Sequence, residues 1–483
     1  MKETLHKAPA PAAPLWRNHD FLLASGSRFF AAAGMGAVVI TVMLRLQAES
    51  AGNGSGAGPW LVAAYLACSA LPLVLLAPWA GRLADTRDSR TLATAASLAS
   101  AAAVTGMAFG LQDGALNLPL LFAMTFLLDA AQAVAGPTWQ ALLPRIVGEE
   151  RTPKAVGTMQ ATTMIAGMAG PAAGGLLTGW GGPGLVVAVA GGCYLAMGAG
   201  ALLIRTRRGT AAERAGRPAP ALLDGLRLLR RDTLVWALVL GAMFFIVAGE
   251  ATNVLEVFLA RGELGASEAE YGLLAAAFGL GMATGAALAG RIGNGRNRLR
   301  ALLAAMVLTS ALLGATALVP TVAWLFAAYA ATGASCGVLN ACFGAITILR
   351  IPETGRGQAM AILGGMTRAV SIAALALGGL LGAALPVRTS FLATGTAGVL
   401  VAAAVAVVVL RIPGAEQSGT DHSGTDQPGG TQSGRNQEAV PDQVGDVVEQ
   451  PLPEGAAVVA LVSAEKGIKR PGDLPGGELA VAR

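Results

Sequence analysis

Long apolar stretches, separated by short clusters of charged residues, glycine and proline, follow one another along most of this chain. An apolar helix needs about 20 residues to cross the hydrocarbon core of a bilayer, and these stretches have about that length. They predict twelve transmembrane helices, near residues 20–46, 58–80, 90–111, 116–138, 155–179, 183–204, 233–259, 270–290, 300–319, 321–348, 357–383 and 388–410.

The composition agrees with this pattern. Hydrophobic residues make up 54% of the 483 residues and charged residues only 13%, with a mean hydropathy of +0.59. A soluble domain carries roughly 25% charged residues, so a soluble protein of this composition would expose large apolar patches. We therefore expect an all-α membrane protein. The first twenty residues contain no apolar segment typical of a cleavable signal peptide.

The basic residues predict how the chain is oriented. Most of the 34 lysines and arginines fall in every second connection, and the other connections hold only Arg45, Arg261 and Arg388. Because cytoplasmic loops carry the excess of Lys and Arg, we expect a multi-pass protein of the cytoplasmic membrane with both termini in the cytoplasm. Basic residues spread over so many separate segments form no contiguous face, which argues against nucleic-acid binding.

Two halves of six helices are predicted on either side of the longest basic loop. The letters GGLL at 174–177 recur at 378–381, and the Gly81-Arg82 pair recurs as Gly290-Arg291 at a similar offset. This repetition favours duplication, although GGLL arises easily in a chain with 65 glycines. The predicted organisation is an N-terminal segment 1–19, a bundle 20–204, an inter-bundle loop 205–232, a second bundle 233–411 and a disordered tail 412–483.

The loop GRLADTRDSR, residues 81–90, carries a recognisable motif. With the twelve helices and two halves, it resembles the major facilitator superfamily over residues 15–410, and the matching residues are Gly81, Leu83, Ala84, Asp85 and Arg90. Thr86, Asp88 and Ser89 depart from the family pattern. The resemblance implies two pseudo-symmetric six-helix bundles and a loop that latches the cytoplasmic side, with Arg82, Arg87 or Arg90 holding Asp85. The alternative is a solvated turn.

Two further segments resemble the branch that includes siderophore exporters and macrolide-type efflux pumps, PTWQALLPRIV at 137–147 and IPETGRGQAMAI at 351–362. The letters GPAAGG at 170–175 resemble the core of a motif in the fifth helix of drug and metabolite antiporters, although Ala166 stands where glycine is usual. Small residues on successive turns let two helices approach closely, and ordinary helix packing is the alternative explanation. The matching residues are Gly170, Pro171, Gly174 and Gly175.

Five ionisable residues fall within predicted spans, and such residues are costly unless they serve a function. They are Arg28, Asp129, Glu250, Glu256 and Arg368. Asp129 shares a helix face with Thr125 and Gln132, and it stands where many antiporters of the family have an arginine. Arg28 and Asp129 lie at similar depths, about 12–14 Å from the inner face. We predict an Arg28–Asp129 pair that separates on proton or substrate binding; a static packing pair is the alternative.

Glu250 and Asn253 share a face of the seventh span, and we expect them in the outward part of a central cavity. Glu256 is expected near the interface and Arg368 is expected to snorkel inward. The four cysteines show no metal-ligand spacing, and no P-loop or nucleophile motif is present. We expect no metal, no cofactor and no enzymatic activity.

The predicted function is secondary transport, specifically proton-coupled efflux of small amphipathic compounds through a binding site between the halves. The expected partners are the lipid bilayer, a small-molecule substrate and protons, and we expect the protein to act as a monomer. An importer of the same fold and a non-transporting scaffold or sensor are the alternatives.

Overall fold

The computed structural model describes residues 15–53, 57–76, 79–80, 83, 87–111, 116–206, 222–293, 295–351 and 356–411, and long helices dominate these ranges. The first half holds α1 (His19–Asn53), α2 (Gly58–Leu75), α4 (Ser89–Gly110), α5 (Leu118–Val147) and α6 (Thr152–Leu203). The second half holds α8 (Thr233–Val257), α9 (Glu268–Ala289), α10 (Gly295–Ala315), α11 (Val322–Arg350), α12 (Arg356–Ala384) and α13 (Val387–Leu410). Short helical segments accompany them, namely η1 (Leu15–Arg17), η2 (Glu149–Arg151), α7 (Leu222–Arg231), η3 (Phe258–Glu263) and η4 (Thr316–Leu318).

Eleven of the described helices are long and apolar enough to cross a membrane, and α6 crosses twice. Gly182 interrupts α6 with φ 70°, a left-handed conformation that glycine adopts without strain. Gly170 packs on Ala33 of α1, and Cys193 packs on the adjacent Gly34. Because residues on either side of Gly182 reach the same level of α1, the chain reverses there. The prediction of twelve transmembrane helices is therefore confirmed.

Several of these helices begin at side chains that satisfy free backbone N–H groups. Asp88 accepts hydrogen bonds from the N–H and the hydroxyl of Thr91 and so caps α4. Asp232 accepts from two backbone N–H groups at the start of α8. Ser267 and Glu270 form a reciprocal capping box at the start of α9. These caps fix where an apolar helix starts, which hydropathy alone leaves open.

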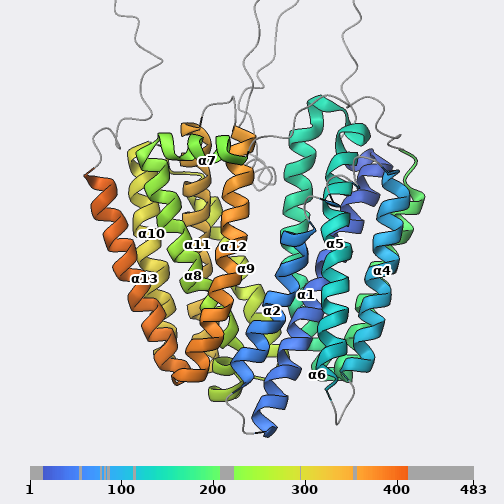
Figure 1. Ribbon diagram of the computed structural model, residues 1–483, viewed down its shortest axis with the longest axis horizontal. Coiled ribbons are helices and arrows are strands. Elements are labelled where there is room, and N and C mark those ends of the chain that lie inside the picture. The colour runs from blue at the N-terminus through green and yellow to red at the C-terminus, as the bar shows by residue number, and fades with distance from the viewer. Residues whose placement is uncertain are drawn as a thin grey trace, which may run out of the picture. The chain divides into compact units, whose positions relative to one another are not determined.

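The helices form two six-helix bundles, as the sequence predicted (Figure 1). In the first bundle α1 packs along both limbs of α6, and in the second α8 packs on α12 and α13 while α9 packs on α11. Between the bundles, α6 packs on α9 and α2 packs on α12. All described helices belong to one compact unit, residues 1–421. Helix α7 occupies the last part of the stretch that the sequence predicted to be inter-bundle loop, and the predicted tail 412–483 lies outside the described residues.

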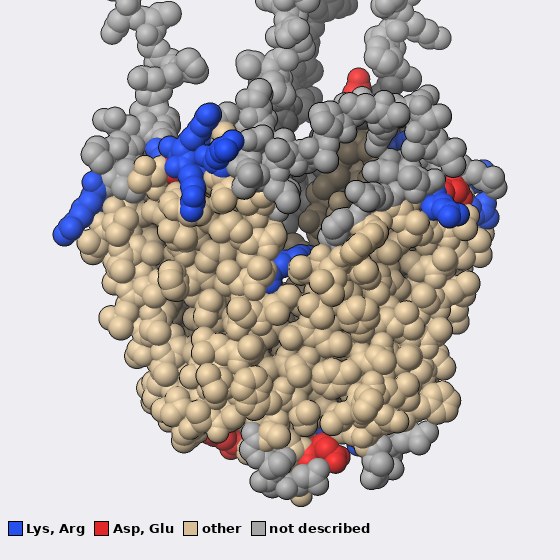
Figure 2. All heavy atoms as spheres, in the orientation of Figure 1, with Lys and Arg blue, Asp and Glu red and all other residues tan. Residues whose placement is uncertain are grey.

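Charge marks the two ends of the bundles differently. Figure 2 shows most basic atoms at the end where α7 lies, hereafter the basic end, and acidic atoms at both ends. Helix α1 starts at the basic end, and the crossings then alternate in direction. The described basic residues of this end are Arg17, Arg87, Arg90, Arg145, Arg151, Lys154, Arg205, Arg227, Arg230, Arg231, Arg291, Arg296, Arg298, Arg300, Arg350 and Arg411.

The two bundles touch near the opposite end. A Cβ atom added to Gly175 of α6 would stand 2.8 Å from the Cα of Gly272 of α9, so the two backbones are in direct contact. A Cβ atom on Gly379 of α12 would likewise stand 2.9 Å from the side chain of Ala63 of α2. Toward the basic end, Figure 2 shows a recess between the bundles. We call this recess the central cleft; it is open to the basic end and closed at the opposite end.

Candidate transport site

Asp129 lies in the interior of the first bundle. Its side chain is only 3% exposed, and the carboxyl group shares a hydrogen bond with Ser69 of α2. Tyr65 of α2 and Tyr194 of α6 are fully buried and close enough to Asp129 for electrostatic interaction. No described residue forms a hydrogen bond with the Tyr194 hydroxyl. One carboxyl group and three hydroxyl groups thus lie among three helices. Gain or loss of a proton by the carboxyl group changes the interactions between these helices.

The predicted Arg28–Asp129 ion pair is not formed in this structure. Arg28 makes no hydrogen bond or ion pair with any described residue, while the carboxyl group of Asp129 bonds Ser69 instead. The expectation of a shared depth is wrong, because α5 continues to Val147. Asn18 at the start of α1 bonds Ile146, so by helix rise Arg28 lies about 15 Å and Asp129 about 26 Å below that level. The carboxyl group of Asp129 points between α2 and α6. The pair remains a prediction for other conformations.

Thr125 and Gln132 also face helix contacts of the first bundle instead of the cleft. Thr125 is buried, and its hydroxyl donates to the carbonyl oxygen of Leu121 in its own helix at 2.8 Å. The Gln132 amide donates to the hydroxyl of Ser100 of α4, also at 2.8 Å. The polar stripe on α5 therefore joins neighbouring helices, and its expected place in the cavity wall is not what the structure shows.

Glu250 joins two helices of the second bundle. Its carboxylate accepts hydrogen bonds from the Asn253 amide at 3.0 Å, one turn away on α8, and from the Ser371 hydroxyl of α12 at 3.2 Å. The structure thus brings Glu250 and Asn253 together, and Asn253 itself is exposed. Both partners of this carboxyl group are neutral side chains.

Glu256 is placed differently from the sequence expectation. It was expected to be wetted at the interface, but its carboxyl group shares a hydrogen bond with the hydroxyl of Tyr329 of α11 and lies near Tyr271 of α9. The Tyr271 hydroxyl in turn reaches the Sδ atom of Met43 of α1 at 3.7 Å. A chain of polar contacts therefore runs from the interior of the second bundle to the surface of the first.

The glycines of the 170–175 motif form the contact surface of α6. Gly170 and Gly174 lie against the backbone of Ala33 and Ala37 of α1, where an added Cβ would stand 2.9 Å and 2.6 Å from their Cα atoms. The Pro171 ring lies against Gly36 of α1, and Gly175 lies against α9 as described above. One short motif thus holds α6 against its own bundle and against the other bundle.

Only part of the 81–90 loop lies within the described residues, and Gly81 and Asp85 lie outside them. The Arg87 N–H donates to the carbonyl oxygen of Leu83 at 3.0 Å, and Arg90 lies in the first turn of α4. Asp88, which departs from the family pattern, is the cap of α4. Sequence reasoning missed this role, although an aspartate directly before a helical stretch is a recognised cap signal.

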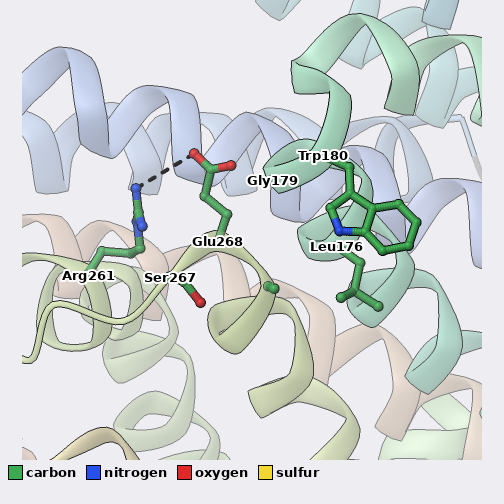
Figure 3. A pocket seen from close by; sticks show the side chains of 7 residues that line it. Leu176, Gly179, Trp180, Arg261, Ser267 and Glu268 are labelled. Carbon is green, nitrogen blue, oxygen red and sulfur yellow. Dashed lines mark ion pairs between the residues drawn. The ribbon is translucent and has the colours of Figure 1, made fainter.

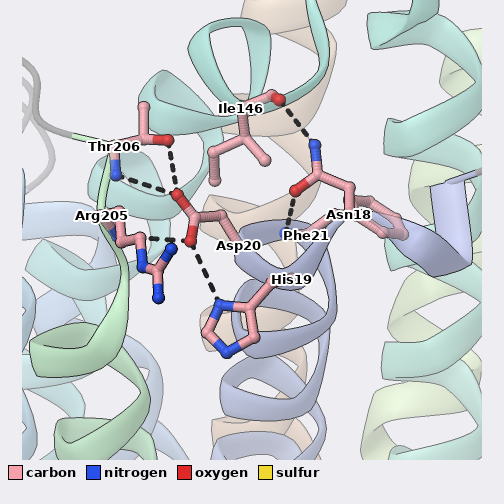
Figure 4. A network of polar contacts seen from close by, with 7 residues as sticks. All are labelled: Asn18, His19, Asp20, Phe21, Ile146, Arg205 and Thr206. Carbon is pink, nitrogen blue, oxygen red and sulfur yellow. Dashed lines mark hydrogen bonds and ion pairs between the residues drawn. The ribbon is translucent and has the colours of Figure 1, made fainter. Parts of the chain in front are cut away.

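A network at the basic end closes the first bundle (Figure 4). The Asp20 carboxylate accepts from the backbone N–H groups of Arg205 and Thr206, at 3.3 Å and 2.9 Å, and from the Thr206 hydroxyl at 2.6 Å. The Asn18 amide donates to the carbonyl oxygen of Ile146 at 2.9 Å. The start of α1 is thereby tied to the ends of α5 and α6, and we call these contacts the Asp20 clasp.

At the opposite end, a cavity of about 380 Å³ lies where α6 meets the second bundle (Figure 3). Leu176, Gly179 and Trp180 contribute one side, and the other side holds an ion pair between Arg261 and Glu268 with N–O separation 3.7 Å. Trp180 is 84% exposed. This cavity is shallow and lies outside the bundle contact, so it marks the outer rim of the closed end.

Metal chemistry finds no support in the described residues, where no group of three or more His, Cys, Asp or Glu side chains could hold an ion. The four cysteines are free thiols on separate helices or separate turns.

Comparison of the sequence with models of known protein families identifies the family of this protein. A family model described as transmembrane secretion effector matches residues 53–430, more than three quarters of the chain. The chain belongs to this family. It is therefore a membrane transporter of the major facilitator kind, and the superfamily resemblance of the sequence is confirmed. A comparison with curated proteins finds no significant sequence match.

Solved transporter structures share the fold of this family member. A variant of the nucleoside transporter NupG aligns with a TM-score of 0.61 and 12% identity, covering 80% of this chain and 99% of the other. A bacterial homologue of the lysosomal transporter Spinster aligns at 0.60 and 13%, covering 82% and 97%. A bacterial homologue of the iron transporter ferroportin aligns at 0.60 and 16%, covering 82% and 98%. At these identities the likeness concerns the fold alone.

Proposed function

We propose that this family member is a proton-coupled exporter of small amphipathic compounds in the cytoplasmic membrane, acting as a monomer with both termini in the cytoplasm. The observation that carries the proposal is the central cleft, open at the basic end and closed by helix contacts at the other. The excess of basic residues at the open end supports a cytoplasmic location of that end in the proposal. The family description refers to secretion, and the 170–175 motif resembles that of antiporters.

Transport then proceeds by alternating access. Substrate enters the open cleft from the cytoplasm, the bundles close at the basic end, and the glycine contacts of α6 with α9 and of α12 with α2 separate at the other end. Glycine surfaces suit this role because they bring backbones together without interlocking side chains. The loop 81–90 is the proposed latch of the closed basic end.

Asp129 is the proposed proton carrier. A buried carboxyl group changes its interaction with surrounding helices when it gains or loses a proton, and here α2 supplies Ser69 and Tyr65 while α6 supplies Tyr194. The first limb of α6 forms the contact with α9, and Tyr194 lies on the second limb beyond Gly182, so protonation at Asp129 acts on the limb that follows the bundle contact along the chain. Glu250 is proposed as a second polar site of the cleft through Asn253.

Sided flux measurements test the proposal. Inverted membrane vesicles containing the protein are screened with amphipathic dyes, antibiotics and siderophores, with and without an uncoupler. An exporter accumulates substrate inside these vesicles, and the uncoupler abolishes accumulation. Asp129→Asn is expected to remove the uncoupler-sensitive part, whereas Glu150→Gln, which removes an exposed carboxylate at the basic end, is the matched control.

Three outcomes contradict parts of the proposal. Accumulation in right-side-out vesicles alone would indicate an importer. Normal pH-dependent transport by Asp129→Asn between about pH 6 and 8 would exclude this residue as the proton carrier. An absence of flux, together with a biological effect that depends on residues 412–483, would favour a scaffold or sensor.

A further inference from the structure

Two arginines within the membrane spans have no partner among the described residues, Arg28 of α1 and Arg368 of α12. The three arginines near the opposite end differ from them. Arg45 donates to the carbonyl oxygen of Leu111, and Arg261 donates to that of Ala266. Arg388 pairs with Glu263 and donates to two carbonyl groups. Arg28 and Arg368 thus differ from the arginines of the opposite end, each of which has a partner.

Both arginines lie deep in the membrane. Arg28 follows Asp20 of the clasp by eight residues, which corresponds to about 12 Å of helix. Glu250 lies about 27 Å beyond Asp232, the start of α8, and Ser371 bonds Glu250, so Arg368, one turn before Ser371, lies about 22 Å deep. The hydrocarbon core is about 30 Å thick, so at about 22 Å from the start of the helices Arg368 lies in its interior, whereas Arg28 lies closer to the basic end. The expected inward snorkelling of Arg368 does not account for its position.

Arg368 faces the central cleft. It is 11 residues, or three helical turns, from Gly379, so the two residues share one face of α12. That face touches Ala63 and Trp60 of α2 at the level of Gly379. At the level of Arg368, closer to the basic end, the side chain is exposed. The guanidinium group therefore lies at the surface of the second bundle, on the face of α12 that contacts α2 farther along.

Arg28 stands on the opposite wall. It lies about 60° around α1 from Met43 and about 160° from Phe30. Met43 reaches Tyr271 of the other bundle, while Phe30 is exposed on the outer side. Arg28 is therefore turned inward, toward the second bundle, and it is half-buried.

The acidic groups of the region are already engaged. Glu250, the carboxylate nearest Arg368, is held by Asn253 and Ser371. Asp129 is held within the first bundle by Ser69, and Glu256 within the second by Tyr329. An unpaired guanidinium group at this depth is costly unless an anion or water satisfies its five N–H donors. Among the described residues, no carboxyl group forms a hydrogen bond or an ion pair with either guanidinium group, and the bonds of Glu250, one turn from Arg368, are with two neutral side chains.

We infer that Arg28 and Arg368 recognise the negative group of the transported molecule, which makes the substrate an amphipathic organic anion with a carboxylate or phosphate group on an apolar body. Guanidinium groups bind such groups with paired hydrogen bonds. The inference rests on the proposed function, since it names the substrate of that same cleft. It replaces the cationic substrate that acidic residues within the spans would otherwise favour.

The arrangement also couples closure to loading. When the basic end closes, the two walls approach and the two like charges repel each other. A bound anion removes the repulsion and attracts both walls, so the loaded cleft closes more readily than the empty one. The empty protein therefore closes its basic end less readily, which suppresses conversion between the two open conformations without substrate.

Binding of three pyrene probes with the same apolar body tests the inference. Pyrenebutanoic acid, pyrenebutanol and pyrenebutylamine are titrated into the purified full chain in a neutral detergent, and tryptophan quenching reports binding. The acid is expected to bind about 10- to 100-fold more tightly than the alcohol, and the amine most weakly. Salt should reduce the preference.

Arg28→Gln and Arg368→Gln should each lower the preference for the acid, and the double variant should abolish it. Arg28→Lys and Arg368→Lys should retain part of it, because lysine keeps the charge but not the paired donors. Arg411→Gln, at the end of α13, is the control and should change nothing. Gel filtration and thermal denaturation establish that each variant is folded.

Equal binding of acid and alcohol, or a preference that survives in the folded double variant, would overturn the inference. Nanodiscs distinguish a soluble anion from a lipid headgroup. If phosphatidylglycerol discs displace the acid and phosphatidylcholine discs do not, the site belongs to a lipid and the substrate assignment is wrong. Binding requires no flux, so failure of the transport assay leaves this result standing, whereas flux without preference for the anion overturns the inference alone.

Discussion

The contact between Gly175 and Gly272 should decide which end of the cleft is open. A Cβ at Gly175 would stand 2.8 Å from the Cα of Gly272, whereas carbon atoms prefer about 3.5–4.0 Å. In Gly175→Ala the two helices must therefore separate by about 1 Å. Overpacking of this kind costs about 1–3 kcal/mol. The cost applies only while the bundles touch, so it shifts the equilibrium about 5- to 150-fold toward the conformation that is open at the outer end.

Spin labels measure this shift. Trp180→Cys and Leu318→Cys place labels on exposed positions of the two bundles near the outer end, in a chain whose four native cysteines are replaced by alanine. Electron–electron resonance should show a larger population at long distance in Gly175→Ala, and Gly272→Ala should reproduce it. Gly167→Ala is the matched control, because nothing lies within 4 Å of a Cβ at that position of α6. An unchanged distribution in folded Gly175→Ala, or an equal shift in the control, would refute the reasoning.

Three further substitutions should lower the temperature of unfolding in detergent, followed with a thiol-reactive dye. Asp20→Ala leaves three donors of the clasp without their acceptor and should cost about 1–3 kcal/mol; Asp20→Asn, which keeps one acceptor oxygen, should cost less. Asp88→Ala removes the cap of α4 and should cost about 1 kcal/mol, and full stability of this variant would show that the cap contributes nothing. Gly182→Ala forces a Cβ into a left-handed conformation and should cost about 1–2 kcal/mol, while Gly191→Ala, in open space on the same helix, should not.

The sequence predicted the number of crossings because hydrophobic length is a property of each segment alone. It placed the end of α5 too early, at 138, whereas the helix continues to Val147 through Pro137 and Pro144. Proline ends most helices of soluble proteins, but within a membrane neighbouring helices compensate for the lost hydrogen bond. Helix α7 was missed since its ten residues are too short to give a hydropathy signal.

The site was predicted less completely than the fold. The predicted equal depth of Arg28 and Asp129 is wrong, because α5 ends nine residues later than expected, and the rotation of each helix about its axis depends on how the whole bundle packs. The sequence therefore paired two residues that point in different directions. The Glu250–Asn253 bond is a local feature one turn long, and local spacing is enough to predict it. The role of Arg368 depends on where the bundles part, which no single helix reveals.

The Asp20 clasp also has a consequence for biosynthesis. Its acceptor lies at the start of the first crossing, and its donors, Arg205 and Thr206, follow the sixth. During translation, these contacts form only after the sixth transmembrane helix has been synthesised and inserted. All residues of the Asp20 clasp are then present, so the amino-terminal bundle can close before any carboxy-terminal helix has been inserted.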